Sequence, residues 1–387
     1  MTASASTLVE PDIADGIPWS EAPIIARKEQ LGRIFVDRDV TQHVFDVINS
    51  ARADRHIYPE AKNVVIMGET GVGKSEIAKR YLADNQESVD PETGNIVRPV
   101  LYVDVRDSST PRTLARAILR RLMRRNGIDQ DADWTDPPED AEMSRKQTED
   151  EDKRQFVEGA AAELTYQLKK QMVGQQVEVV ILDEFHNTLK DEGVGTLNRV
   201  ANWTRDFAKT KERTPRLPDG TVAENIVIVM MGTYKVRNIV DPTRHPELCG
   251  ISPYRVEIPR YRYVTISEKQ EFRQFLDDLD AVLPFDTDSS LGMDQLADKL
   301  HIATFGLLRQ VGQIIGKAGE FAIDDGSDHI HEHHLHRAVV MLPGVLEAAM
   351  LSEESTKAER KLAANPFTPP LLPAGPVERK RTSYQPS

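Results

Sequence analysis

The sequence predicts a mixed α/β fold, in which a mainly parallel sheet is flanked by helices and is followed by a small all-helical domain. Three observations lead to this prediction. A glycine-rich pattern joins an apolar strand to a helix between residues 63 and 84. Short apolar runs then alternate with helical patterns as far as about residue 262. From residue 267 onward only helical periodicity remains.

The glycine-rich pattern lies between a strand, Asn63–Met67, and a helix, Glu76–Asp84, and it fits G-x-x-x-x-G-K-[ST]. Its glycines let backbone N–H groups close around phosphate oxygens, and the helix start adds its own free N–H groups. Lys74 is placed to reach the β and γ phosphates of ATP, and the hydroxyl of Ser75 to bind Mg²⁺. The candidate nucleotide-binding residues are Gly68, Glu69, Thr70, Gly71, Val72, Gly73, Lys74, Ser75 and Glu76.

Composition limits the class of protein. The chain has 387 residues, enough for more than one domain, and a net charge of −13 that disfavours nonspecific nucleic-acid binding by the whole surface. No apolar run is long enough to span a membrane, and the first residues lack a signal-peptide pattern. Cys249 is the only cysteine, which excludes an intrachain disulfide and favours a reducing, cytoplasmic location.

The start of the chain is expected to be a mobile arm over residues 1–23, followed by a mostly helical stretch, Ile24–Ala53. A second strand is expected at Val100–Val105, and Thr110-Pro111 then opens a helix as N-cap and first residue. This helix carries an apolar stripe of Leu114, Ile118 and Leu122.

Arginines lie along the same helix, with no acid between Ser108 and Ile128. They form either a solvated surface face or a contact to the phosphate backbone of DNA, to which arginine binds bidentately. The candidate DNA-binding residues are Arg112, Arg116, Arg120, Arg121 and Arg124. The following segment, 129–152, is acidic and proline-containing and reads as a flexible insertion.

A third strand, Val177–Leu182, follows a helix expected at Phe156–Met172 and ends in Asp183-Glu184. An apolar strand that closes on two acids, downstream of a phosphate loop, is the Walker B pattern. Asp183 would hold Mg²⁺, and Glu184 would polarise the attacking water. The alternative, an acidic helix N-cap, is disfavoured by the phosphate loop.

The later elements complete the pattern. A helix is expected at Thr196–Lys209 and strands at Ile226–Met231 and Tyr254–Ile258. The helices of the second domain are expected at Ser267–Leu279, Leu291–His301, Phe305–Phe321 and His331–Leu342. Residues 348–387 read as a proline-rich, disordered tail suited to docking. Histidines at 329, 331, 333, 334 and 336 match no specific metal motif, so a metal site there is the less favoured interpretation.

The order of these elements resembles that of the AAA+ ATPases, with a nucleotide-binding domain over residues 24–262 and a helical lid over 263–347. The stretches RHIYPEAKNVVIMGETGVGKS, VVILDEFHNTL, IVIVMMGTYKV and SPYRVEIPRYRY resemble the TniB family, which is related to TnsC and MuB. That family comprises ATP-dependent regulators of target selection in DNA transposition. The acidic segment 129–152 has no match in it.

The resemblance implies further roles. Thr233 corresponds to sensor 1 and Arg309 to sensor 2. Arg255 corresponds to an arginine finger that enters the ATP site of a neighbouring subunit, and Arg244 is the alternative candidate for that role. Each has a structural alternative: a helix cap, a surface arginine or a salt bridge in the lid. The resemblance also implies a homo-oligomer, either a ring or a helical filament, that forms on double-stranded DNA with ATP and Mg²⁺ and recruits a transposase and a target-selector protein. The alternative function is a protein-binding switch or helicase-loader-like ATPase that does not bind DNA directly.

Overall fold

The structure is a computed structural model that describes residues 18–34, 36–92, 94–105, 110–123, 161–189, 194–208, 225–350 and 365–367. It divides into two compact units, residues 37–260 and a second unit made of residues 1–36 with 261–387. The acidic segment 129–152, Arg124, most of the N-terminal arm and nearly all of the tail lie outside the described residues.

The first unit contains a five-stranded sheet in the order β4-β5-β6-β1-β7. Every neighbouring pair in it is parallel, which confirms the predicted fold class. The strands are fully buried except for β4 and the edge strand β7, as expected for a sheet covered on both faces. Their bounds are β1 Val64–Met67, β4 Val100–Asp104, β5 Val179–Asp183, β6 Val227–Gly232 and β7 Tyr254–Glu257.

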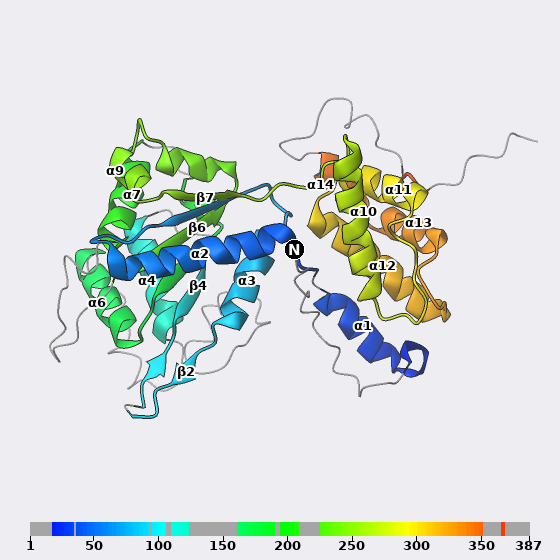
Figure 1. The fold of residues 1–387 in the computed structure, drawn as a ribbon, viewed down its shortest axis with the longest axis horizontal. Helices are drawn as coiled ribbons and strands as arrows, with labels where there is room; N and C mark the ends of the chain where they lie inside the picture. Colours follow the sequence, from blue (N-terminus) through cyan, green and yellow to red (C-terminus); the bar gives the residue numbers. More distant parts are fainter. Residues whose placement is uncertain are drawn as a thin grey trace, which may run out of the picture. The chain divides into compact units, whose positions relative to one another are not determined.

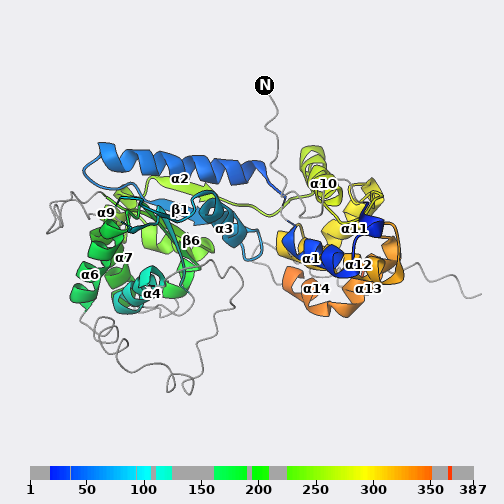
Figure 2. The same ribbon diagram turned by 90° about the horizontal axis from the view of Figure 1, so that it is seen from below.

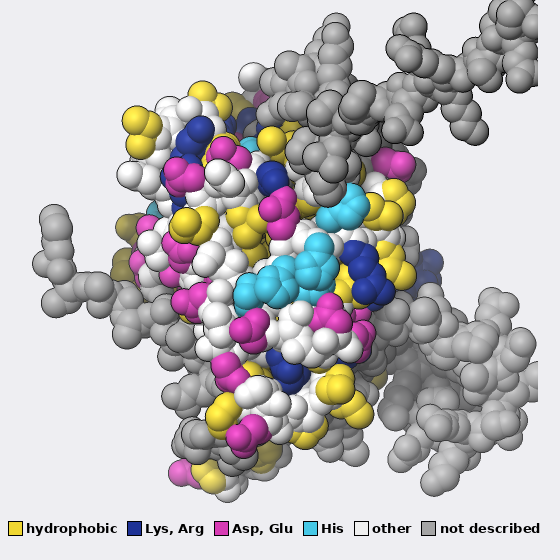
Figure 3. Space-filling model, turned by 90° about the vertical axis from the view of Figure 1, so that its right-hand side faces the viewer, with side chains coloured by type: hydrophobic (Ala, Val, Ile, Leu, Met, Phe, Trp, Pro, Cys, Tyr) yellow, Lys and Arg dark blue, Asp and Glu magenta, His cyan; other side chains and the backbone are white. Residues whose placement is uncertain are grey.

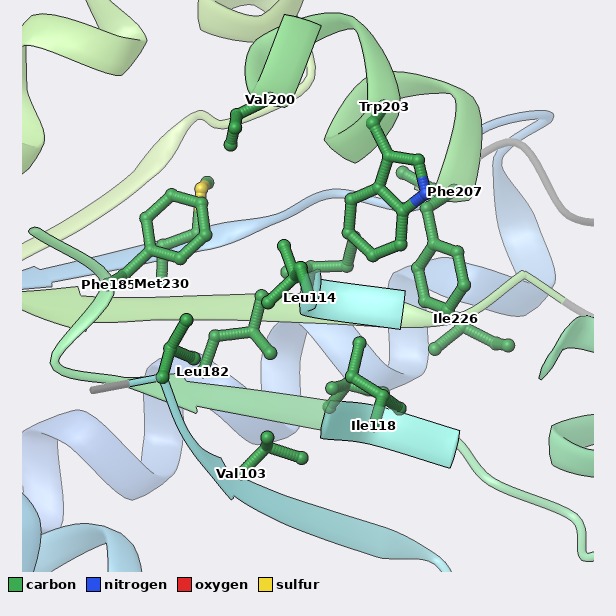
Figure 4. Close-up of a cluster of buried hydrophobic side chains, with 14 of the residues drawn as sticks. Val103, Leu114, Ile118, Leu182, Phe185, Val200, Trp203, Phe207, Ile226 and Met230 are labelled. Atoms are coloured by element: carbon green, nitrogen blue, oxygen red, sulfur yellow. The ribbon is translucent and has the colours of Figure 1, made fainter. Parts of the chain in front are cut away.

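Helices cover the two faces of this sheet (Figures 1 and 2). On one side lie α2 (Asp39–Ile57) and α3 (Lys74–Asp84); on the other lie α4 (Pro111–Met123), α6 (Ala161–Gly174) and α7 (Val194–Ala208). The second group packs its apolar side chains on the alternate strand residues that point towards it. Figure 4 shows this core, where Leu114 and Ile118 of α4 meet Leu182 and Met230 of the sheet. The apolar stripe predicted for the arginine helix is therefore its buried side.

Short elements add to those that the sequence predicts. A hairpin of β2 (Ser88–Val89) and β3 (Ile96–Val97) precedes β4. The 3-10 helices η3 (Phe185–Leu189) and η4 (Tyr234–Val240) and the helix α9 (Pro246–Gly250) lie between the predicted elements. Each of these helices has at most seven residues, too few for a 3.6-residue period to appear in the sequence.

The second unit is all-helical, as predicted. Its elements are η1 (Trp19–Glu21), α1 (Ile24–Arg33), α10 (Ile266–Ala281), α11 (Asp294–Thr304), α12 (Leu308–Asp325), α13 (Glu332–Met341) and α14 (Pro343–Met350). They share one apolar core that includes Phe272, Leu300 and Ile314. Helix α12 begins later than expected, because Phe305 adopts a left-handed conformation (φ 49°) that ends α11 instead.

The expected domain boundary needs a correction at its N-terminal end, because α1 belongs to the helical unit rather than to the nucleotide-binding unit. Gly319 of α12 leaves room for the side chain of Leu31, which a Cβ at that position would meet at 2.9 Å. Arg27 Nε donates to the Pro284 carbonyl over 3.1 Å, and Lys28 pairs with Asp324 at 2.6 Å. The helical pattern of Ile24–Ala53 is thus two helices, separated at residues 34–38.

Residues just before α1 are also held in place, unlike the mobile arm that was expected up to residue 23. The backbone N–H groups of Trp19 and Ser20 donate to the carboxylate of Asp286, over 2.6 and 2.9 Å. Across the described ranges, none of the helices combines the length and the hydropathy that crossing a bilayer requires.

Candidate functional site

The glycine-rich loop joins β1 to α3, as the sequence predicts. Gly71 and Gly73 have φ angles of 92° and 93°, a region that favours glycine over other residues. Gly68 is needed for a different reason, because a Cβ there would lie 2.5 Å from the Ile258 carbonyl oxygen. The loop is therefore a backbone cradle that runs directly into the N-terminus of α3, where helix N–H groups are free to bind an anion.

Lys74 is buried, and its ammonium lies against this loop. Nζ donates to the carbonyl oxygens of Gly68 (2.9 Å) and Glu69 (2.7 Å), so the charge is held where the phosphates of a nucleotide are expected. Ser75, the next residue of α3, is partly exposed. Within the motif, Glu69 and Val72 are buried, whereas Thr70 and Glu76 face solvent.

Asp183 ends β5 and is almost fully buried. Its Oδ2 accepts a hydrogen bond from the hydroxyl of Tyr102 (2.8 Å), and its Oδ1 accepts the backbone N–H of Glu184 (2.8 Å). Burial, reinforced by the charge of Asp183, holds the pKa of Tyr102 far above its usual value, so the phenol stays a neutral donor. Tyr102 could not be identified as a site residue from the sequence, where its only signal is a hydroxyl in an otherwise apolar strand.

Glu184 has an unusual backbone, with a φ angle of 54°, which is uncommon outside glycine and marks a functional constraint or strain. This turn lets the chain pass from β5 directly into η3, and it places the Glu184 carboxylate beside His186. His186 Nδ1 lies 3.3 Å from Glu184 Oε2 and 3.5 Å from the backbone nitrogen of Thr233. His186, which the sequence analysis did not single out, therefore links the acid to the end of β6.

Thr233 follows β6 directly, and the chain packs tightly there. A Cβ on the preceding residue, Gly232, would lie 3.1 Å from the backbone nitrogen of His186. Thr233 Oγ1 is buried and has no hydrogen-bond partner among the residues described. A buried hydroxyl without a partner costs free energy, so this atom fits a site that is completed by a polar ligand.

These features fit a nucleotide and a divalent cation. The loop offers N–H groups, Lys74 offers a positive charge, and Thr233 offers a hydroxyl in need of a partner. The hydroxyl of Ser75 and the carboxylate of Asp183 are hard oxygen donors of the kind that Mg²⁺ prefers. The glycine-rich loop, the acids Asp183 and Glu184, and Thr233 all lie at the carboxyl ends of parallel strands. This is the edge at which α/β sheets bind their ligands.

The three candidate arginines lie in different places. Arg255 is exposed on the edge strand β7, opposite Val65 at the start of the loop strand, and it donates to the Val240 carbonyl (3.2 Å) and Cys249 Sγ (3.1 Å). Arg244 is exposed just before α9. Arg309 is exposed at the start of α12, in the helical unit. The roles of arginine finger and sensor 2 stay predictions.

The arginine helix α4 keeps its cations at the surface. Arg112 and Arg120 are exposed, and Arg116 and Arg121 are partly exposed. The buried Arg98 donates to the carbonyl oxygens of Arg121 (3.3 Å) and Leu122 (3.1 Å), which anchors the last described turn of the helix. Arg98 is in turn paired with Glu87 at 2.5 Å.

Comparisons with known proteins agree with this geometry. Residues 58–240 match the family model described as AAA domain. The Aeropyrum pernix ORC2 protein, solved as ADPNP-ADP complexes, is similar in structure, with a TM-score of 0.52, 16% sequence identity and coverage of 81% of this chain and 71% of that one. Cdc6p from Pyrobaculum aerophilum is also similar, with a TM-score of 0.50, 12% identity and coverage of 81% and 70%. No curated protein matches the chain significantly. The fold is the AAA+ P-loop fold, with a helical region after the sheet.

Proposed function

We propose that this AAA+ ATPase is an ATP-dependent regulator of DNA transposition, which assembles on double-stranded DNA, marks a target site and recruits a transposase. ATP hydrolysis then drives its disassembly. The AAA domain and the fold support the ATPase activity. The assignment to transposition goes further and is supported by the resemblance of four sequence stretches to TniB proteins.

In the proposed reaction each side chain has one task. Lys74 neutralises the phosphates, and Glu184 takes up a proton from the attacking water. Thr233 Oγ1, which has no partner among the described residues, orients that water. Tyr102 and the Glu184 N–H hold both oxygens of Asp183 in place. Mg²⁺, held by Ser75 and Asp183, would polarise the phosphate oxygens.

The observation that carries the DNA-binding proposal is the arginine face of α4. The chain as a whole has a net charge of −13, so DNA must meet a local basic surface. The apolar side of α4 is buried, which leaves its arginines at the surface, and Arg98 anchors the last described turn of the helix. Contacts from arginine to phosphate carry no sequence information, which suits a protein that accepts many target sites.

Changing Arg116 and Arg120 to glutamate in one variant is expected to weaken DNA binding uniformly across sequences. Each lost phosphate contact removes about one unit from the slope of log affinity against log salt concentration, because fewer counterions are released. The measurement is DNA affinity at several salt concentrations with ATP present. ATP binding by the variant should survive, since α4 does not contribute to the phosphate loop.

A charge-matched control reverses Arg33 and Arg262, two exposed arginines of the helical unit, to glutamate, because it changes the net charge equally at another surface. This control should keep the affinity and the salt slope. Unchanged DNA binding in the α4 variant would exclude this face as the DNA surface. It would favour the second candidate function, a protein-binding AAA+ switch that does not contact DNA directly.

Arg255 is proposed to complete the ATP site of a neighbouring subunit. It is exposed on the edge strand, with its guanidinium near Val240 and Cys249. The rate of ATP hydrolysis per chain should then rise with protein concentration. Arg255→Ala chains should be nearly inactive alone, and they should regain part of the rate when mixed with Lys74→Ala chains, because mixed interfaces pair an intact arginine with an intact loop.

The Arg244→Ala variant serves as the comparison, since Arg244 is the rival for the same role. A concentration-independent rate, without recovery in the mixture, would contradict a trans-acting Arg255. Arg309 would then become the favoured candidate, and it would act on the nucleotide of its own chain.

A further inference from the structure

Histidines gather around the junction of α12 and α13 in the helical unit, and Figure 3 shows a strip of histidine side chains in cyan on this face. The rings of His329 and His331 have centroids 3.9 Å apart, and those of His331 and His333 are stacked at 5.4 Å. His333 and His334 lie 3.9 Å apart. The proposed ATPase site uses none of these side chains.

The local backbone explains this gathering. Helix α12 ends at Asp325 with Gly326 in the left-handed conformation (φ 75°); the chain then bends at Asp328 and His329 and is extended at His331, just before α13. Ile330 is buried, and its N–H donates to Ser289 Oγ over 3.0 Å. His329 and His331, on either side of Ile330, are partly exposed, so both histidines turn away from the core that Ile330 enters.

His334 is the structural member of the cluster. Its side chain is 1% exposed; Nδ1 accepts the backbone N–H of His331 (3.0 Å), and Nε2 lies 2.7 Å from Asp325 Oδ2. A nitrogen that accepts an N–H carries no proton, so the proton of a neutral ring is on Nε2 and is donated to Asp325. Hydrogen bonds from Ser327 lower the pKa of Asp325 to about 2 and keep it ionised. His334 therefore has no lone pair left for a metal ion.

His334 differs in its bonding from a second group of side chains, which consists of Asp328, His329 and His331. One ligand atom from each lies within 4.8 Å of the other two. His329 Nδ1 is 2.7 Å from Asp328 Oδ1, so the side chains of these two candidate ligands already lie together. The three side chains are exposed or partly exposed, and they can move. Ligand atoms around tetrahedral zinc lie about 3.3 Å apart, so small rotations bring them into range.

We propose that Asp328, His329 and His331 bind one divalent transition-metal ion, for which Zn²⁺ is the appropriate probe. Two imidazoles and one carboxylate are a donor set that zinc accepts, with water as the fourth ligand. The bound ion ties the segment after α12 to His331, the residue before α13. His334 and Asp325 supply the rigid base beneath it, through their hydrogen bonds to backbone and side chain.

Calorimetric titration of the metal-stripped full chain with ZnCl₂ tests this site, with Mg²⁺ in excess to occupy the oxygen ligands of the ATPase site. One zinc ion per chain is expected, together with a higher melting temperature, because an ion that binds only the folded state stabilises it. A variant with His329→Ala and His331→Ala should lose about tenfold or more in affinity. The isosteric Asp328→Asn variant should also bind zinc more weakly.

The matched control is His336→Ala, a histidine of the same segment whose ring lies near Asn365 and outside the ligand group. This variant should bind zinc as the unchanged chain does. Melting curves in a chelator show whether the variants fold, since without zinc they should match the parent. Absence of saturable binding, or unchanged affinity in both the double variant and Asp328→Asn, would overturn the proposal. Loss of binding only on His333→Ala would assign the ion to other ligands and also overturn it.

Discussion

Replacing Lys74 by alanine is expected to abolish ATP binding at concentrations that saturate the unchanged chain. The ammonium is buried against the loop, with Nζ 2.9 Å from the Gly68 carbonyl and 2.7 Å from that of Glu69. A charge-assisted hydrogen bond contributes roughly 1.5–3 kcal/mol. Loss of two such bonds to phosphate weakens binding by about a hundredfold or more. Titration with a fluorescent ATP analogue measures the effect.

Lys79→Ala is the matched control, because Lys79 lies on the same helix, is exposed and pairs with Glu76 at the surface (2.9 Å). It should bind ATP normally. Thermal melts distinguish lost binding from lost folding, since Lys74 also bonds the loop carbonyls. A folded Lys74→Ala variant that bound ATP with the affinity of the unchanged chain would contradict the assignment of this loop as the phosphate-binding loop.

The second large effect is expected for Glu184→Gln, which should bind ATP as the parent chain does and lose turnover. The amide keeps the size of the side chain and cannot accept the proton of the attacking water. General-base catalysis contributes about 10²–10⁴-fold to the rate, so kcat should fall within this range. Phosphate release measures turnover, and nucleotide titration measures binding on the same preparation.

The same isosteric change at Glu320, a partly exposed residue of α12 paired with Lys317, should leave the rate unchanged. It shows whether the loss is specific to the acid after β5. If Glu184→Gln hydrolysed ATP as fast as the parent chain, the Glu184 carboxylate would not be the general base. The left-handed backbone at this residue would then serve only to lead the chain from β5 into η3.

Much of the nucleotide-binding unit could be predicted because its signals are local. The apolar runs that became β1, β5 and β6 are each buried along their whole length, so periodicity and composition were sufficient. The phosphate loop is a contiguous pattern whose glycines are required by backbone geometry. The apolar stripe of α4 likewise predicts which side of that helix is buried.

The parts that were missed depend on contacts between distant segments. Tyr102 matters because β4 pairs with β5, and His186 because the end of β6 packs against η3. Neither contact can be inferred from the residues that flank Tyr102 or His186 in the sequence. The position of α1 was missed for the same reason, since its partner α12 lies almost 300 residues further along the chain, as the pairing of Lys28 with Asp324 shows (a separation of 296).

The histidine cluster illustrates a third limit. Its spacing matches no metal motif in the sequence, and only the bend after α12 brings Asp328, His329 and His331 together. The fold also removes one member, because His334 is committed to the His331 N–H and to Asp325. Which histidines can bind an ion thus depends on hydrogen bonds that form only once the turn after α12 is folded, and residue spacing alone does not show them.

The central claim is that ATP binding by this chain controls its assembly on DNA. The most direct measurement is the anisotropy of a labelled DNA duplex titrated with the unchanged protein, in the presence of ATP with Mg²⁺, of ADP with Mg²⁺, or of no nucleotide. The account predicts tight, cooperative and salt-sensitive binding with ATP, and much weaker binding in the other two conditions. DNA affinity that is absent, or equal in all three conditions, would contradict it.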